Sequence, residues 1–154
     1  MLTVTEIRNL TFSIGAALAE NKKKILVVDD EPDTVMFLSN LLESDGFEPV
    51  VAENQAQGLW MARTKNPAVI LIDMAMPREA GIELYRSMKQ DGDLKTTPVI
   101  MLSNLDKKTF FQYQKSIPLP DAYLLKPPEA EELLGIIREL SERDGVNEKT
   151  EAEE

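Results

Sequence analysis

The sequence contains no cysteine and no histidine. The absence of cysteine excludes disulfides, thiolate zinc sites and thiol nucleophiles, and the absence of histidine removes the commonest general base and metal ligand. Any metal must therefore bind through oxygen atoms, which favours hard cations such as Mg²⁺ or Ca²⁺. Covalent chemistry is left to serine, threonine, lysine, tyrosine, aspartate or glutamate.

Basic side chains are scarce relative to acidic ones. The chain has 17 Lys and Arg residues against 27 Asp and Glu residues, which gives a formal net charge of −10. An acidic surface repels phosphate backbones, so the charge argues against nucleic acid as a partner. No apolar run approaches the ~20 residues that cross a bilayer, and the apolar stretch at residues 10–19 is too diluted by polar residues for a signal peptide. We therefore expect no membrane partner either.

The chain has the length of about one domain, since it holds 154 residues. Its 43% hydrophobic and 29% charged residues are typical of a folded globular protein. We divide it into an N-terminal extension at residues 1–21, a domain at 22–141 and an acidic tail at 142–154. The tail lacks an apolar period, so we expect it to be disordered.

Short apolar runs alternate with segments of helical period from Lys24 onward, a pattern that predicts an α/β fold with a doubly wound (βα)₅ parallel sheet. The predicted strands are Lys24–Val28, Phe47–Ala52, Ala68–Ile72, Pro98–Leu102 and Ala122–Leu125. The predicted helices are Pro32–Ser44, Asn54–Lys65, Ile82–Gln90, Asp106–Lys115 and Pro128–Leu140.

The N-terminal extension is also predicted to be helical. Thr3 and Glu6 have the spacing of a capping box, and several apolar residues share one helical face: Val4, Ile7, Leu10, Ile14, Ala17 and Leu18. Two interpretations stay open. The helix packs against its own domain, or it serves dimerisation or partner binding.

Polar residues follow the predicted strands at the edge where open parallel sheets bind ligands. They are Asp29 and Asp30 after the first strand, Asp73 after the third, Ser103 after the fourth and Lys126 after the fifth. Three converging carboxylates would repel one another unless a cation lies among them, and Mg²⁺ fits because it needs few protein ligands. A lysine and a hydroxyl nearby supply what a phosphoryl group needs. Taken singly, the aspartates read as helix caps and Ser103 as a turn hydroxyl.

Four motifs follow one another along the chain: KILVVDDE at Lys24–Glu31, VILIDMAMPREAG at Val69–Gly81, PVIMLSN at Pro98–Asn104 and DAYLLKPP at Asp121–Pro128. In this order they resemble the CheY-like receiver domain of two-component response regulators. The resemblance implies a flavodoxin-like fold with strand order 2-1-3-4-5.

The resemblance also implies a role for each site residue. Asp73 would be the phosphoacceptor, taking a phosphoryl group from a histidine kinase or a histidine phosphotransfer protein. Mg²⁺ would be held by Asp30, Asp73 and the backbone carbonyl of Ala75, with Asp29 acting largely through bound water. The remaining roles would fall to Lys126, paired with the phosphate, Ser103, the switch hydroxyl, and Tyr123, the switch aromatic, which alone would read as packing. A cis Lys126–Pro127 bond is implied as well.

Some positions depart from the family pattern. Asn104 stands where Ala or Gly is usual, the segment 116–120 carries two prolines where a Gly-Ala turn is usual, and Pro128 stands where an aromatic residue is common. Phe110, Phe111 and Tyr113 make the region of the predicted helix at 106–115 unusually aromatic.

The function predicted from the sequence is a stand-alone, cytoplasmic response regulator receiver that is not an enzyme beyond its own phosphorylation and dephosphorylation. It would contact an unknown downstream protein through the face formed by residues 106–115, 122–125 and 128–140, with a homodimer as a further option. A phosphorelay intermediate and a degenerate scaffold are the alternatives. A phosphatase of the haloacid dehalogenase type is disfavoured, because Ala75 stands where that family has a second aspartate.

Overall fold

Five parallel strands form the centre of the protein in the computed structural model, which describes the backbone of residues 1–153 and the side chains outside 16–20 and 144–154. The strands are β1 (Lys24–Val28), β2 (Glu48–Ala52), β3 (Val69–Asp73), β4 (Val99–Ser103) and β5 (Ala122–Leu125). They pair in the order β2-β1-β3-β4-β5, which confirms the predicted fold class and topology. Leu26 lies beside Val50 on one side and Ile70 on the other, which sets the register of β2, β1 and β3.

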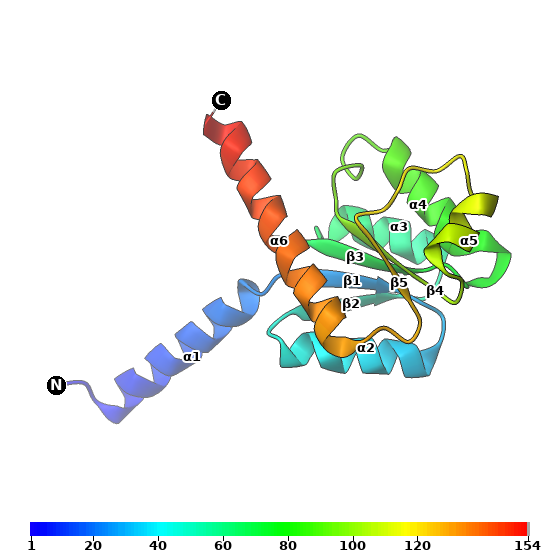
Figure 1. Ribbon diagram of the computed structural model, residues 1–154. Helices are drawn as coiled ribbons and strands as arrows, with labels where there is room; N and C mark the ends of the chain where they lie inside the picture. Colours follow the sequence, from blue (N-terminus) through cyan, green and yellow to red (C-terminus); the bar gives the residue numbers. More distant parts are fainter. Residues whose placement is uncertain (154) are drawn as a thin grey trace.

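Helices cover both faces of the sheet (Figure 1). One face is covered by α2 (Pro32–Ser44) and α6 (Ala130–Glu153), and the other by α3 (Gln55–Thr64), α4 (Ala80–Gln90) and α5 (Lys107–Tyr113). Side chains alternate along each strand, so in β1 Ile25 and Val27 pack toward α2 and α6 while Leu26 and Val28 pack toward the other three helices. Both faces of the sheet are buried, which explains why the strands read as continuous apolar runs.

Local sequence sets the helix starts. Asn54 and Asp106 cap α3 and α5 by accepting hydrogen bonds from the amides of Gln57 and Thr109. Pro32 occupies the first turn of α2, where its missing amide costs nothing. A short 3₁₀ turn, η1 (Pro77–Glu79), precedes α4 and was not predicted.

The N-terminal helix α1 (Val4–Glu20) forms as predicted, and it extends away from the domain (Figure 1). The capping box is present, since the Thr3 amide donates to the Glu6 carboxylate and the Glu6 amide donates to the Thr3 hydroxyl. Every described side chain in residues 1–15 is exposed. The interpretation that this helix packs against its own domain is therefore wrong for these residues.

Helix α6 does not end near Leu140 but continues to Glu153, so the prediction of a disordered tail from residue 142 is wrong. The charge of the tail suggested a solvated coil, yet glutamate, lysine, arginine and alanine are strong helix formers and no proline follows Pro128. The Lys23 ammonium donates to the Ser141 carbonyl at 2.8 Å, which joins α6 to the segment before β1. Among the described residues no helix has both the length and the apolar character needed to cross a membrane.

Candidate functional site

The carboxyl ends of β1, β3, β4 and β5 bring the predicted polar residues to one edge of the sheet. Asp73 and Ser103 are the last residues of β3 and β4. The prediction placed each of them directly after its strand, so each strand is one residue longer at this end than predicted. Asp29 and Asp30 follow β1 directly, and Lys126 follows β5. Asp29 and Asp73 are each only 1% exposed, whereas Asp30 faces solvent. Two buried carboxylates in an apolar sheet require charge compensation nearby.

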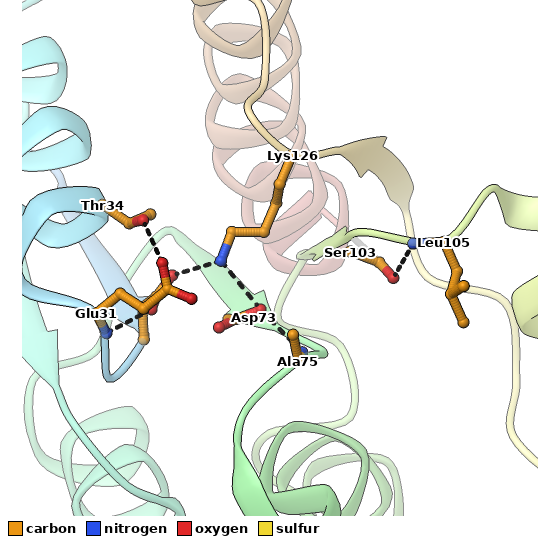
Figure 2. A network of polar contacts seen from close by, with 8 residues as sticks. Glu31, Thr34, Asp73, Ala75, Ser103, Leu105 and Lys126 are labelled. Atoms are coloured by element: carbon orange, nitrogen blue, oxygen red, sulfur yellow. Dashed lines mark hydrogen bonds and ion pairs between the residues drawn. The ribbon is translucent and has the colours of Figure 1, made fainter.

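Lys126 supplies that compensation. Its ammonium lies 3.2 Å from Asp29 Oδ2 and 3.2 Å from Asp73 Oδ1, and Figure 2 shows the Lys126 side chain pointing toward Asp73. Burial by itself would lower the pKa of Lys126, but the charges of Asp29 and Asp73 outweigh that effect and raise it above its usual value. Lys126 is therefore fully charged at neutral pH. The peptide bond that follows it, Lys126–Pro127, is cis as expected.

Backbone amides hold the two buried carboxylates in place. The Glu31 amide donates to Asp29 Oδ1 at 2.9 Å, and the Ala75 amide donates to Asp73 Oδ1 at 2.9 Å (Figure 2). Burial raises the pKa of the Asp29 carboxyl and the neighbouring Asp73 charge adds to this, against the lowering effects of the Glu31 amide and Lys126. Asp73 Oδ2 is buried and has no hydrogen-bond partner among the described residues.

These residues fit a hard divalent cation. Asp29, Asp30 and Asp73 each offer a carboxylate oxygen, and the three oxygens lie within 4.8 Å of one another. One ammonium cannot balance three carboxylates, and Asp73 Oδ2, which no described residue contacts by a hydrogen bond, is available to a cation. Oxygen donors in this number suit Mg²⁺, which retains several waters of its own. The Ala75 amide donates to Asp73 Oδ1. The role of the Ala75 carbonyl as a cation ligand stays a prediction.

Ser103 and Tyr123 are linked through the backbone of Leu105. The Leu105 amide donates to Ser103 Oγ at 3.1 Å, and the Tyr123 hydroxyl donates to the Leu105 carbonyl at 2.5 Å. Partial burial raises the pKa of Tyr123, so its hydroxyl stays protonated and able to donate at neutral pH. The Tyr123 ring packs against Phe110 and Phe111, with centroid separations of 5.4 and 5.9 Å. A continuous set of contacts therefore joins the strand edge to α5.

The loop between β3 and α4 approaches Asp73 very closely. A Cβ added at Gly81 would lie 2.3 Å from the Asp73 backbone carbonyl oxygen, so glycine is required there by space. Arg78 and Glu79 both have positive φ, 60° and 56°, a conformation that costs free energy in residues other than glycine. In the sequence Gly81 stood out only as the last residue of the motif Val69–Gly81, and no sequence signal indicated the positive φ values of Arg78 and Glu79.

Tyr85 is a further residue that the sequence did not single out. It is fully buried on α4, and its hydroxyl donates to the Pro118 carbonyl at 2.9 Å. This contact fixes the two-proline segment that leads into β5. In the sequence Tyr85 has the helical spacing of an ordinary core residue, so only the structure reveals its hydrogen bond to Pro118. Asn104, the departure noted beside Ser103, is exposed and lines a hollow of about 350 Å³ with Phe37 and Lys126.

Comparison with known proteins agrees with this geometry. Residues 25–138 match the family model of the response regulator receiver domain. Protein PilH of Pseudomonas aeruginosa is 35% identical over 74% of this chain and 93% of its own length, and protein PilG of the same organism is 34% identical over 75% and 84%.

The heme response regulator HssR of Staphylococcus saprophyticus is 31% identical over 79% of this chain and 53% of its own length, so the chain spans about half of that relative. Solved structures include the Francisella response regulator 1452 receiver domain, with a TM-score of 0.68 and 32% identity over 79% of this chain and 98% of that one. The chemotaxis protein CheY4 of Vibrio cholerae has a TM-score of 0.69 and 27% identity over 77% and 98%. The chain belongs to the response regulator receiver domain family.

Proposed function

We propose that this receiver accepts a phosphoryl group on Asp73 in a Mg²⁺-dependent reaction, with a phosphohistidine of a histidine kinase or histidine phosphotransfer protein as the donor. The observation that supports this most directly is the buried Asp73 carboxylate, which is held by Lys126 and the Ala75 amide while its second oxygen has no hydrogen-bond partner in the part of the chain that the structure describes. Such an arrangement orients a carboxylate nucleophile instead of merely burying it.

In the proposed reaction the Asp73 carboxylate attacks phosphorus, the phosphorus–nitrogen bond to the donor imidazole breaks, and the imidazole leaves with the bonding pair. The product is an acyl phosphate. Lys126 lies close enough to bind a phosphoryl oxygen, and Asp29, Asp30 and Asp73 would hold Mg²⁺. Bound there, Mg²⁺ neutralises charge that develops on the phosphoryl oxygens.

We further propose that phosphorylation alters a face made of α5, β5 and the start of α6, where a downstream protein binds. Ser103 would turn toward the new phosphoryl oxygens and give up the Leu105 amide, and Tyr123 would respond through the same backbone. This face contains a hollow of about 420 Å³ lined by Tyr123, Leu125 and Pro127 among others. Tyr113 is 78% exposed and Leu125 52% exposed, so apolar surface is available for contact.

The test is intact mass after incubation with acetyl phosphate and Mg²⁺. We expect one adduct of ~80 Da on the wild type and none on Asp73→Asn or in EDTA. Asp93→Asn is the matched control, since Asp93 is an exposed aspartate away from the strand edge, and it should acquire the adduct at the wild-type rate.

An adduct that persists in Asp73→Asn would place the acceptor elsewhere. If no adduct forms on the wild type, beryllofluoride binding to the Mg²⁺-loaded protein separates rapid hydrolysis from an inactive site. Failure of both would favour a scaffold that works without phosphorylation.

A further inference from the structure

Helix α1 carries apolar surface that the described part of the chain does not cover. Ile7, Leu10 and Ile14 are 51%, 49% and 56% exposed, and Phe12 is 79% exposed. Figure 1 shows the helix leaving the domain without contact along its N-terminal part. Because a soluble domain rarely leaves such a contiguous set exposed, this surface is expected to have an occupant.

The composition of α1 also indicates that the helix needs a packing partner to be stable. Five of its 17 residues are β-branched and one is glycine, which are weaker helix formers than alanine or leucine. Isolated helices of about this length are marginal in water even when rich in alanine, and most helices gain their stability from packing. The capping box sets where α1 begins, but it contributes too little to hold the helix alone.

The exposed residues have the spacing of a two-stranded helix pair. Ile7, Leu10 and Ile14 follow each other at intervals of three and four, and the sequence continues this spacing at Ala17. Ile7 and Ile14 occupy one of the two core positions of the heptad, and Leu10 followed by Ala17 occupies the other. Isoleucine at the first position with leucine at the second is the choice that favours two parallel strands. Phe12 lies outside this seam. A seam of this kind is complementary to an identical one, as symmetric dimers require.

The charges of the chain are compatible with a second copy. Residues 1–24 hold four basic and two acidic side chains, whereas the rest of the chain holds 13 basic and 25 acidic ones. The strong negative charge therefore lies outside the N-terminal segment, and two such segments meet without the repulsion that would act between two of the acidic domains. The helix extends outward from the domain, which leaves it accessible to a second copy.

We infer that α1 is a dimerisation helix that pairs with α1 of a second copy through Ile7, Leu10 and Ile14. The helix spans only about 25 Å at 1.5 Å per residue, so the interface is small and the association is concentration-dependent, with a dissociation constant on the order of 10–100 μM. The inference does not depend on phosphorylation of Asp73.

Sedimentation equilibrium of the full chain between about 1 μM and 1 mM tests it. The wild type should pass from a 17.3 kDa monomer to twice that mass as concentration rises. Leu10→Lys should weaken association by at least about 10-fold, since each dimer loses two seam leucines. Phe12→Lys adds the same charge to a more exposed apolar residue outside the seam and should leave association within about 2-fold of wild type. Asp73→Asn should dimerise like the wild type, which separates this result from the phosphoacceptor test.

A wild type that stays monomeric to about 1 mM overturns the inference. Equal loss in Leu10→Lys and Phe12→Lys overturns it too, because the contact would then be unspecific apolar association. A dimer that survives Leu10→Lys would place the interface elsewhere on the domain. Co-sedimentation of a monomeric wild type with neutral phosphatidylcholine vesicles would make a lipid surface the occupant instead.

Discussion

Lys126 decides the charge balance at the strand edge. It is the positive group within 4 Å of both Asp29 and Asp73, and its side chain is only 8% exposed. Removing a charge from such a buried cluster leaves its partners uncompensated, which costs far more than losing a pair at the surface. The stability of the protein and the occupancy of its cation site are therefore coupled through this residue.

We predict that Lys126→Met lowers the free energy of unfolding by about 3–5 kcal/mol in EDTA, because two buried carboxylates lose their counter-charge. Saturating Mg²⁺ should restore part of this loss, since the cation binds the folded state alone. Urea unfolding with and without Mg²⁺ measures both effects. Lys24→Met is the control, because Lys24 and Glu48 are 3.7 Å apart and well exposed, and it should change stability by less than about 1 kcal/mol. Equal losses in the two variants would contradict the prediction.

Gly81→Ala tests how closely α4 is packed against the phosphoacceptor strand. The new methyl group would meet the Asp73 backbone oxygen at 2.3 Å, so either α4 or Asp73 must move. We expect a loss of about 2–3 kcal/mol in urea unfolding, together with slower adduct formation on Asp73.

Gly135→Ala provides the contrasting substitution for this test. Nothing lies within 4 Å of the added Cβ at this exposed position in α6, so the variant should gain about 0.5–1 kcal/mol from helix propensity. Unchanged stability and unchanged phosphorylation in Gly81→Ala would contradict the prediction, because they would show that the backbone after Asp73 shifts to accept the methyl group at little cost in free energy.

At the level of elements, α4 holds the segment before β5 through the buried Tyr85 hydroxyl and, at the surface, through Arg86, whose guanidinium donates to the Ser116 hydroxyl at 3.4 Å. Burial, with a contribution from the Asp121 charge, raises the pKa of Tyr85 to about 12, so the hydroxyl remains a donor to the Pro118 carbonyl at any neutral pH. We predict that Tyr85→Phe costs about 1 kcal/mol and speeds hydrogen exchange in residues 116–121.

Tyr113→Phe is the control for that experiment. Tyr113 is 78% exposed, and the loss of its hydroxyl should alter neither stability nor exchange. Exchange that stays slow in Tyr85→Phe would mean that the prolines and the other contacts of the segment, such as Arg86 with Ser116 and Asp121 with Val99, hold it without the Tyr85 hydroxyl.

The elements show where sequence reasoning succeeds and where it stops. The five strands lie within one residue of their predicted bounds, because apolar runs between turn signals leave little freedom. Asp29, Asp73 and Lys126 meet as predicted, since parallel strands end at a common edge. The Tyr85 bond and the positive φ values at Arg78 and Glu79 arise from tertiary packing, which no local pattern encodes.

The helix ends were harder to predict. In α6 charge composition and helix propensity gave opposite indications beyond Ser141, and propensity prevailed. In α1 the apolar face was visible in the sequence, but a pattern cannot say whether such a face covers its own domain or another molecule.

At the scale of the whole molecule, α1 is structurally separate from the domain that it precedes. Its described side chains are exposed, and in the described part of the chain the N-terminal segment is joined to the domain at Lys23, whose ammonium donates to the Ser141 carbonyl and whose carbonyl accepts from the Glu48 amide. A helix without packing on the domain contributes little to the cooperative unfolding of that domain. Self-association and phosphoacceptor chemistry are therefore expected to be separable by truncation.

We predict that removing residues 1–21 leaves the urea midpoint and the rate of adduct formation on Asp73 unchanged while it abolishes any concentration-dependent mass increase. Lys23→Met in the full chain should lower the free energy of unfolding by about 1–2 kcal/mol, because it removes the ammonium that donates to the Ser141 carbonyl. It should leave the concentration-dependent mass increase unchanged, because α1 is intact. Urea unfolding and sedimentation of both variants at matched concentrations measure the two effects side by side. A truncated chain that unfolds at a lower urea concentration than the full chain would contradict the prediction, because it would show that α1 packs on the domain in solution.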